Sequence, residues 1–184
     1  MTLRSAFLLV TALFAVACGI DQPTNSQLAA EDPTEALNKL FDEHFERSLE
    51  LSPISATSIG DDRYDDQYAN SIGPEHREAW RALDEEFLQR ILNIDRDGLS
   101  QQDRLSYDIF KLKRETSLAG DQFPWHLAPM NQFGSATSSF VNLGSGTGLH
   151  PFKTVKNYDD FLSRIDGFVV YVDQAIDNMQ EGVR

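Results

Sequence analysis

Apolar residues recur every three or four positions in four stretches of this chain. Each stretch is bounded by residues that typically start or stop helices. This spacing places the apolar side chains on one face of an α-helix. The stretches are residues 33–52, 74–94, 100–120 and 157–182. No segment alternates apolar and polar residues as a half-buried strand would. The sequence therefore predicts an all-α fold built from several amphipathic helices.

Capping residues set the expected helix boundaries. Asp32 followed by Pro33 is typical of an N-cap and the first helical position, and Pro53 should end the helix that they begin. A short helical turn over residues 54–59 is expected next. Pro74 opens the second long helix, and Ser100 caps the third.

Residues 34–184 are expected to form one helical domain with one long irregular loop. In its third helix, Leu105, Ile109 and Leu112 mark the expected buried side. Residues 120–153 are rich in Gly, Ser, Pro and aromatic residues and show no sustained period, which predicts the loop. The last helix is apolar around more than one face, which indicates further packing partners.

Residues 1–18 have the layout of a secretory signal. Arg4 supplies a positive charge, residues 6–17 carry no charge, and Cys18 is the only cysteine. The apolar part is too short to span a bilayer. Ala15-Val16-Ala17 before Cys18 resembles a bacterial lipoprotein box, so lipidation of Cys18 is expected. The polar residues 19–33 then serve as a flexible tether.

These features predict an exported protein that is anchored to the membrane through lipidated Cys18. Gly19 follows the cysteine where Asp would resemble an inner-membrane retention signal, so the outer membrane, facing the periplasm, is favoured. The formal net charge is −13. A phosphate backbone would be repelled by this charge, so nucleic acid is excluded as a partner.

No motif in the chain predicts catalysis or metal binding. None of the four histidines begins a His-Glu-x-x-His pattern, and no serine lies in a Gly-x-Ser-x-Gly elbow. The acidic residues 61–66 lack the spacing of a calcium loop. We therefore expect no catalytic residue, no metal ligand and no cofactor in this chain.

One segment of the irregular loop is a candidate substrate-binding site. The side-chain amides of Asn131 and Gln132 can both donate to and accept from a peptide main chain. Trp125, Phe133 and Phe140 lie nearby in sequence and would supply apolar walls. The alternative interpretation is a packed loop in which the amides bond their own backbone.

Several phrases occur along the chain in a specific order and spacing. They are Leu51–Gly60, Tyr64-Asp65, Ser106–Phe110, Pro129–Gln132, Tyr158–Phe161 and Asn178–Gly182. Together they resemble the start of the bacterial domain-of-unknown-function 885 family, over residues 34–184.

The resemblance implies a function for a longer protein. Members of the family are exported, often lipoproteins, mostly helical and similar to zincin-type metallopeptidases, with a His-Glu zinc helix in the later part. It implies that this chain is the N-terminal portion, that the zinc motif lies beyond Arg184, and that no ligand carries over to these residues. The chain would then be a scaffold and cleft wall for a peptide substrate, without hydrolysing it alone.

Two other interpretations remain open. The chain is a stand-alone acidic lipoprotein that binds a partner or small molecule through the aromatic loop, or it is a decayed gene fragment. No motif specifies the substrate or the oligomeric state, and none distinguishes a biological end at Arg184 from an artefact.

Overall fold

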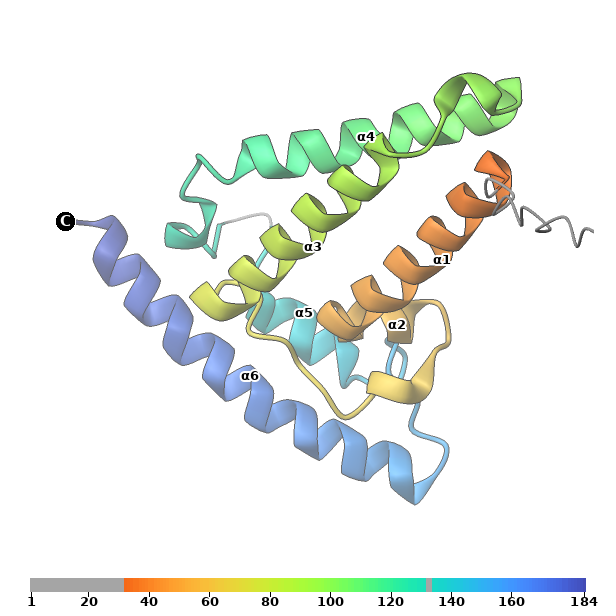
Figure 1. Ribbon diagram of the computed structural model, residues 1–184. Helices are drawn as coiled ribbons and strands as arrows, with labels where there is room; N and C mark the ends of the chain where they lie inside the picture. The colour runs from red at the N-terminus through yellow and green to blue at the C-terminus, as the bar shows by residue number, and fades with distance from the viewer. Residues whose placement is uncertain (1–31, 132–133) are drawn as a thin grey trace, which may run out of the picture. The chain divides into compact units, whose positions relative to one another are not determined.

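The computed structural model describes residues 32–131 and 134–184, which contain six α-helices and no β-strand (Figure 1). The helices are α1 (Pro33–Leu51), α2 (Pro53–Ser58), α3 (Pro74–Leu92), α4 (Gln101–Gly120), α5 (Ala136–Leu143) and α6 (Val155–Gly182). Three short 3₁₀ turns join them, η1 (Asp62–Tyr64), η2 (Arg96–Gly98) and η3 (Trp125–Leu127). The predicted all-α fold is confirmed.

The predicted signal peptide with Cys18 lies outside the described residues. The same is true of the tether except for its last two residues, which form the N-cap and the first position of α1.

The capping residues act as the sequence indicates. The Asp32 side chain accepts a hydrogen bond from the first turn of α1, and the Ser100 side chain accepts one from the first turn of α4. The long helix α6 begins two residues earlier than expected. Thr154 and Asn157 form a reciprocal capping box there, which satisfies backbone groups at both positions.

Helices α1, α3 and α4 pack around one hydrophobic core (Figure 1). Its buried members are Leu37, Leu40, Leu83, Phe87, Ile91, Leu99 and Tyr107. The apolar stripes expected along α1 and α3 supply most of them. At roughly 1.5–3 kcal/mol for each fully buried large apolar side chain, this core is a major source of stability.

The prediction of which side of α4 is buried is wrong. Leu105, Ile109 and Leu112 are about half exposed or more, whereas Tyr107 is buried and Phe110 packs against the core. Both faces of α4 carry apolar residues, so periodicity alone could not choose between them. The contacts with α1 and α3 select the face that carries the aromatic rings.

The segment expected to be one irregular loop contains η3 and the two-turn helix α5. The Ser135 side chain caps α5 by accepting from the Ser138 N–H. Phe140 of α5 is buried and stacks on Phe168 of α6, with ring centroids 4.1 Å apart and planes 2° from parallel. A helix of eight residues gives too few periods to stand out from a Gly- and Ser-rich background.

Candidate functional site

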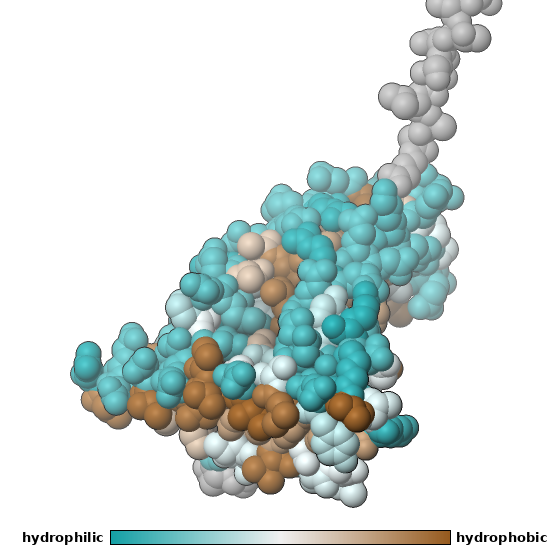
Figure 2. All heavy atoms as spheres, turned by 90° about the horizontal axis from the view of Figure 1, so that it is seen from below, coloured by the Kyte–Doolittle hydropathy of each residue, from teal (hydrophilic) through white to brown (hydrophobic). Residues whose placement is uncertain are grey.

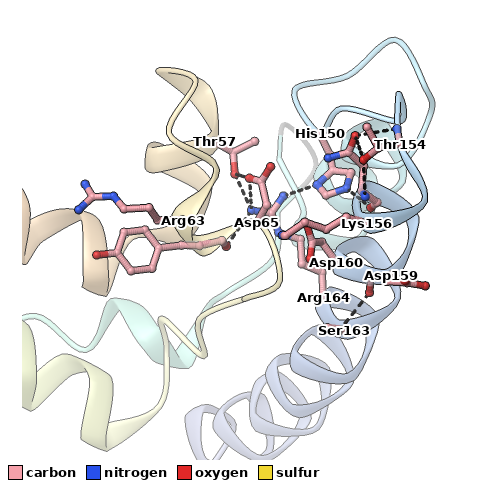
Figure 3. Close-up of polar contacts among 12 residues, drawn as sticks. Thr57, Arg63, Asp65, His150, Thr154, Lys156, Asp159, Asp160, Ser163 and Arg164 are labelled. Atoms are coloured by element: carbon pink, nitrogen blue, oxygen red, sulfur yellow. Dashed lines mark hydrogen bonds and ion pairs between the residues drawn. The ribbon is translucent and has the colours of Figure 1, made fainter.

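A buried charged cluster ties the segment after α2 to the first half of α6 (Figure 3). Arg164 of α6 is fully buried, and its Nη2 lies 3.2 Å from Oδ1 of Asp65, which is also buried. Thr57 of α2 donates its hydroxyl to the same carboxylate oxygen at 2.6 Å. A buried charge is tolerated only with a partner and hydrogen bonds, and Arg164 has both.

Arg164 also donates to His150 and to backbone carbonyls. Nη1 lies 2.7 Å from Nδ1 of His150, while Nε donates to the Gln67 carbonyl at 3.1 Å. Because a guanidinium only donates, Nδ1 of His150 must accept, and its Nε2–H donates to the Asn157 carbonyl at 2.7 Å. The guanidinium of Arg164 therefore holds three segments of the chain together. Because the cluster is closed to solvent, its role is to act as a structural scaffold.

A pocket of about 270 Å³ lies beside this scaffold and has a mainly apolar lining. It is lined by Ile54, Tyr68, Ser139, Phe140, Asn142, Leu143 and Leu149. A second pocket of about 200 Å³ has Ile54 and Tyr68 in common with the first and extends toward His76 and Trp80 of α3. Both are smaller than the range of ~300–1,000 Å³ typical for drug-sized ligands, and each suits a single apolar side chain.

Tyr68 is the residue that both pockets share, and aromatic contacts hold its ring. Phe140, Phe168 and Tyr171 meet it edge-to-face, with centroid distances of 5.3, 5.4 and 5.9 Å. Burial, and then the neighbouring Tyr171, raise the pKa of Tyr68. Its hydroxyl, like that of an ordinary tyrosine, is protonated at neutral pH and can donate a hydrogen bond.

The backbone at Tyr68 approaches α6 closely at Gly167. A Cβ atom at position 167 would lie 2.7 Å from the Tyr68 carbonyl oxygen and 3.0 Å from its Cβ. Only glycine permits this approach, so Gly167 and the Arg164 cluster together determine where Tyr68 stands.

The sequence profile of a family described as "Bacterial protein of unknown function (DUF885)" matches residues 53–184. The chain belongs to the DUF885 family. No curated protein and no solved structure matches it. The match includes α2–α6, the whole Arg164 cluster and every residue that lines the larger pocket. The family resemblance inferred from the ordered phrases is thereby confirmed over residues 53–184 of the 34–184 that were expected.

Asn131, one of the two residues predicted for substrate binding in this DUF885 chain, lines neither of these pockets. Asn131 is exposed, and its Oδ1 accepts from the Gly134 N–H at 3.0 Å, while its own N–H donates to the Gly134 carbonyl at 3.2 Å. Gln132 lies outside the described residues, as does Phe133. A role for Asn131 and Gln132 in substrate binding stays a prediction.

Of the remaining two aromatic residues expected to line a groove, Phe140 lines the larger pocket and Trp125 does not. Trp125 is 74 % exposed and packs beside Phe123. Sequence reasoning missed Ile54 and Tyr68, because neither lies in a periodic stretch or a recognised chemical motif. Ile54 does fall within the family phrase Leu51–Gly60, which was the available signal.

The histidines of the described residues are engaged by other protein groups. His44 accepts a hydrogen bond from Arg114, and His126 is hydrogen-bonded to Arg77. Nε2 of His76 lies 2.7 Å from the Leu51 carbonyl oxygen. Within residues 32–131 and 134–184, no group of three or more His, Cys, Asp or Glu residues is placed to hold a metal ion. These residues therefore do not fit the zinc that the family resemblance implies.

In the described part of the chain, none of the helices is both long enough and apolar enough to cross a membrane.

Proposed function

We propose that this DUF885 chain is the N-terminal helical portion of an exported, peptidase-like lipoprotein and that the two adjoining pockets around Tyr68 form part of one wall of the peptide-binding cleft. The observation that carries the proposal is the pair of adjoining apolar pockets around Tyr68. Every residue of the larger of the two, and every residue of the smaller one except Leu51 and Ser52, lies in the family-matched region. Ile54 and Tyr68, which both pockets share, lie on α2 and on the segment after η1, and Arg164 contacts both of these at Thr57 and Gln67.

The chemistry of the pockets suits a short peptide. Two adjacent pockets can each take one apolar side chain, at roughly 0.8 kcal/mol for each buried CH₂ group. The exposed Ser139 and Asn142 at the rim offer a hydroxyl and an amide for the peptide main chain. A protonated Tyr68 adds one more donor without burying a charge.

The described residues would position a peptide and exclude water from its side chains. Zinc-dependent hydrolysis, which the resemblance implies for the family, needs ligands that these residues do not supply. We assign no bond-breaking step to them, and we expect no peptide hydrolysis by this chain alone.

The proposed location is the periplasmic face of the outer membrane, through lipidated Cys18. This rests on the Arg4-to-Cys18 layout and on Gly19. The test is a fractionation of cells that express the chain or its Cys18→Ser variant. The native chain should sediment with membranes and the variant should not; equal sedimentation of both would contradict lipid anchoring.

The cleft proposal is tested by comparing peptide binding by the native chain with binding by a variant in which a bulky side chain blocks the larger pocket. The chain is screened against a library of short peptides, alongside Ser139→Trp, which places an indole at the rim of the larger pocket. Val141→Trp is the matched control, because Val141 lies on the same helix, is 73 % exposed and lines neither pocket. Binding should fall about tenfold or more in Ser139→Trp only, which is ~1.4 kcal/mol.

Two outcomes of this screen would contradict the cleft proposal. The first is the absence of any bound peptide in the library. The second is equal binding by the native chain and Ser139→Trp, which would move the peptide site elsewhere.

A further inference from the structure

The outward face of α6 carries a continuous heptad seam. From residue 155 to residue 183, apolar residues alternate spacings of three and four without interruption. They are Val155, Tyr158, Leu162, Ile165, Val169, Val172, Ile176, Met179 and Val183. This is the a/d pattern with which helices pair in coiled coils. Over the 28 residues of α6 the seam is about 42 Å long.

The seam is exposed, whereas the opposite face of α6 is buried. Seven of its nine residues are 37–86 % exposed, and the other two, Val172 and Met179, are half-buried. The opposite face holds the buried Arg164, Tyr171 and Asn178. Figure 2 shows a band of hydrophobic residues along this side of the molecule, bordered by polar ones. An apolar surface of this extent marks an interaction site.

A row of carboxylates borders the seam on one side. Asp159, Asp166 and Asp173 recur every seven residues, one position after successive d residues, and all three are exposed. In a coiled coil these are e positions, whose charges select the partner. Among the described residues, no Lys or Arg forms an ion pair with this row; Lys156 of α6 pairs with Asp160 instead, at 2.6 Å.

The charges disfavour pairing of α6 with a second α6. In an antiparallel pair the two rows of aspartates would face each other, and like charges across such an interface are destabilising. In a parallel pair the aspartates would face positions 161, 168 and 175, whose residues are apolar and turned toward the domain. The aspartates would then have no basic partner across the interface. An anionic lipid surface would be repelled by the same row.

We propose that this face of α6 docks an amphipathic α-helix of a partner polypeptide, one that carries an apolar heptad seam flanked by Lys or Arg. The apolar seam supplies the contact area, and the aspartate row supplies the preference for a basic flank. This inference goes beyond the proposed peptide cleft and does not depend on it.

The test uses the full chain with Cys18→Ser and two synthetic helices of 28 residues, the length of α6. The two peptides share one Leu/Ile seam and differ only at the flanking positions, which are Lys in one and Glu in the other. The Lys peptide should bind at least about tenfold more tightly, and the margin should shrink as salt shortens the screening length.

Variants of the chain locate the binding. Val169→Gln replaces a central seam residue with a polar residue that is a good helix former. It should weaken binding of the Lys peptide about tenfold. Leu112→Gln on α4 is the matched control, since Leu112 is 62 % exposed and outside α6; it should leave binding unchanged. Asp166→Lys should reduce the preference for the Lys peptide over the Glu peptide.

Three results would overturn the proposal. The first is equal affinity for the Lys and Glu peptides, and the second is unchanged affinity in Val169→Gln. The third is a dimer of the chain alone that Val169→Gln dissociates, which would show that a second copy covers the seam.

Discussion

Arg164 and Asp65 stand 99 residues apart in the sequence and form an ion pair that is closed to solvent, with Nη2 and Oδ1 3.2 Å apart. Asp65 follows η1, and Tyr68 comes three residues later in the same segment. The pair therefore positions the shared residue of both pockets relative to α6. Its loss should affect stability and ligand binding together.

Replacing Arg164 by Leu should lower the free energy of unfolding by about 3–5 kcal/mol, because Asp65 would remain buried without its partner. Urea unfolding measures the loss. Arg96→Leu is the matched control, since Arg96 pairs with Asp108 at 2.7 Å with both side chains more than 40 % exposed. That variant should lose only about 0–1 kcal/mol.

The double variant Arg164→Leu/Asp65→Leu tests the cause of that loss. Removing the stranded carboxylate should restore a large part of the stability lost in Arg164→Leu. Additive losses in the double variant would mean that packing of the side chains matters, and that their charges do not.

Gly167→Ala should destabilise the fold by about 1–3 kcal/mol, although alanine is the better helix former. The new Cβ would lie 2.7 Å from the Tyr68 carbonyl oxygen, so the segment that carries Tyr68 must shift. Gly120→Ala at the end of α4 meets nothing within 4 Å and should be neutral or slightly stabilising. Thermal melts of the two variants provide the comparison, and equal midpoints would contradict the close approach.

His44 should make stability depend on pH between about 4 and 6.5. Burial, then Arg114 and Arg47, lower the pKa of His44 from 6.5 to about 4 in the folded chain. In that window the unfolded chain binds the proton and the folded chain does not, so stability rises with pH. Allowing for solvent screening of a half-buried group, the contribution between pH 5 and pH 7 is about 1 kcal/mol.

The variant His44→Gln isolates this effect from the titration of the carboxylates. Urea unfolding of the native chain and of His44→Gln at pH 5 and pH 7 gives the difference between their pH dependences. The native chain should gain about 1 kcal/mol more than the variant on going from pH 5 to pH 7. An identical gain would mean that the pKa of His44 is not lowered in the folded state.

Local signals were sufficient to predict the long helices. Asp32 and Ser100 act as N-caps of α1 and α4, and Pro74 is the first residue of α3, as the sequence predicts. The apolar stripes of α1 and α3 face the core. Local signals failed where both faces of a helix are apolar. Leu105 and Ile109 are exposed because contacts with α1 and α3 select the Tyr107 face of α4, and such contacts are not encoded in periodicity.

The pockets could not be predicted from the sequence, because they form between distant segments. Ile54, Tyr68 and Phe140 come from α2, an irregular segment and α5, which only the folded chain brings together. The large apolar content of the last helix was recognised, but its division into an aromatic inner face and an outward seam required the structure. The predicted amides Asn131 and Gln132 rested on residue type alone, without a spacing that fixes their place.

The most direct test of the central claim is a methyl NMR titration of the chain with a capped tripeptide that carries one central Phe. The account predicts shifts concentrated on the methyl groups of Ile54, Leu143 and Leu149, which line the larger pocket. Leu112 and Val141, which are exposed and outside the pockets, should stay unchanged. Shifts confined to other methyl groups, or none at millimolar peptide, would contradict a peptide-binding pocket at Tyr68.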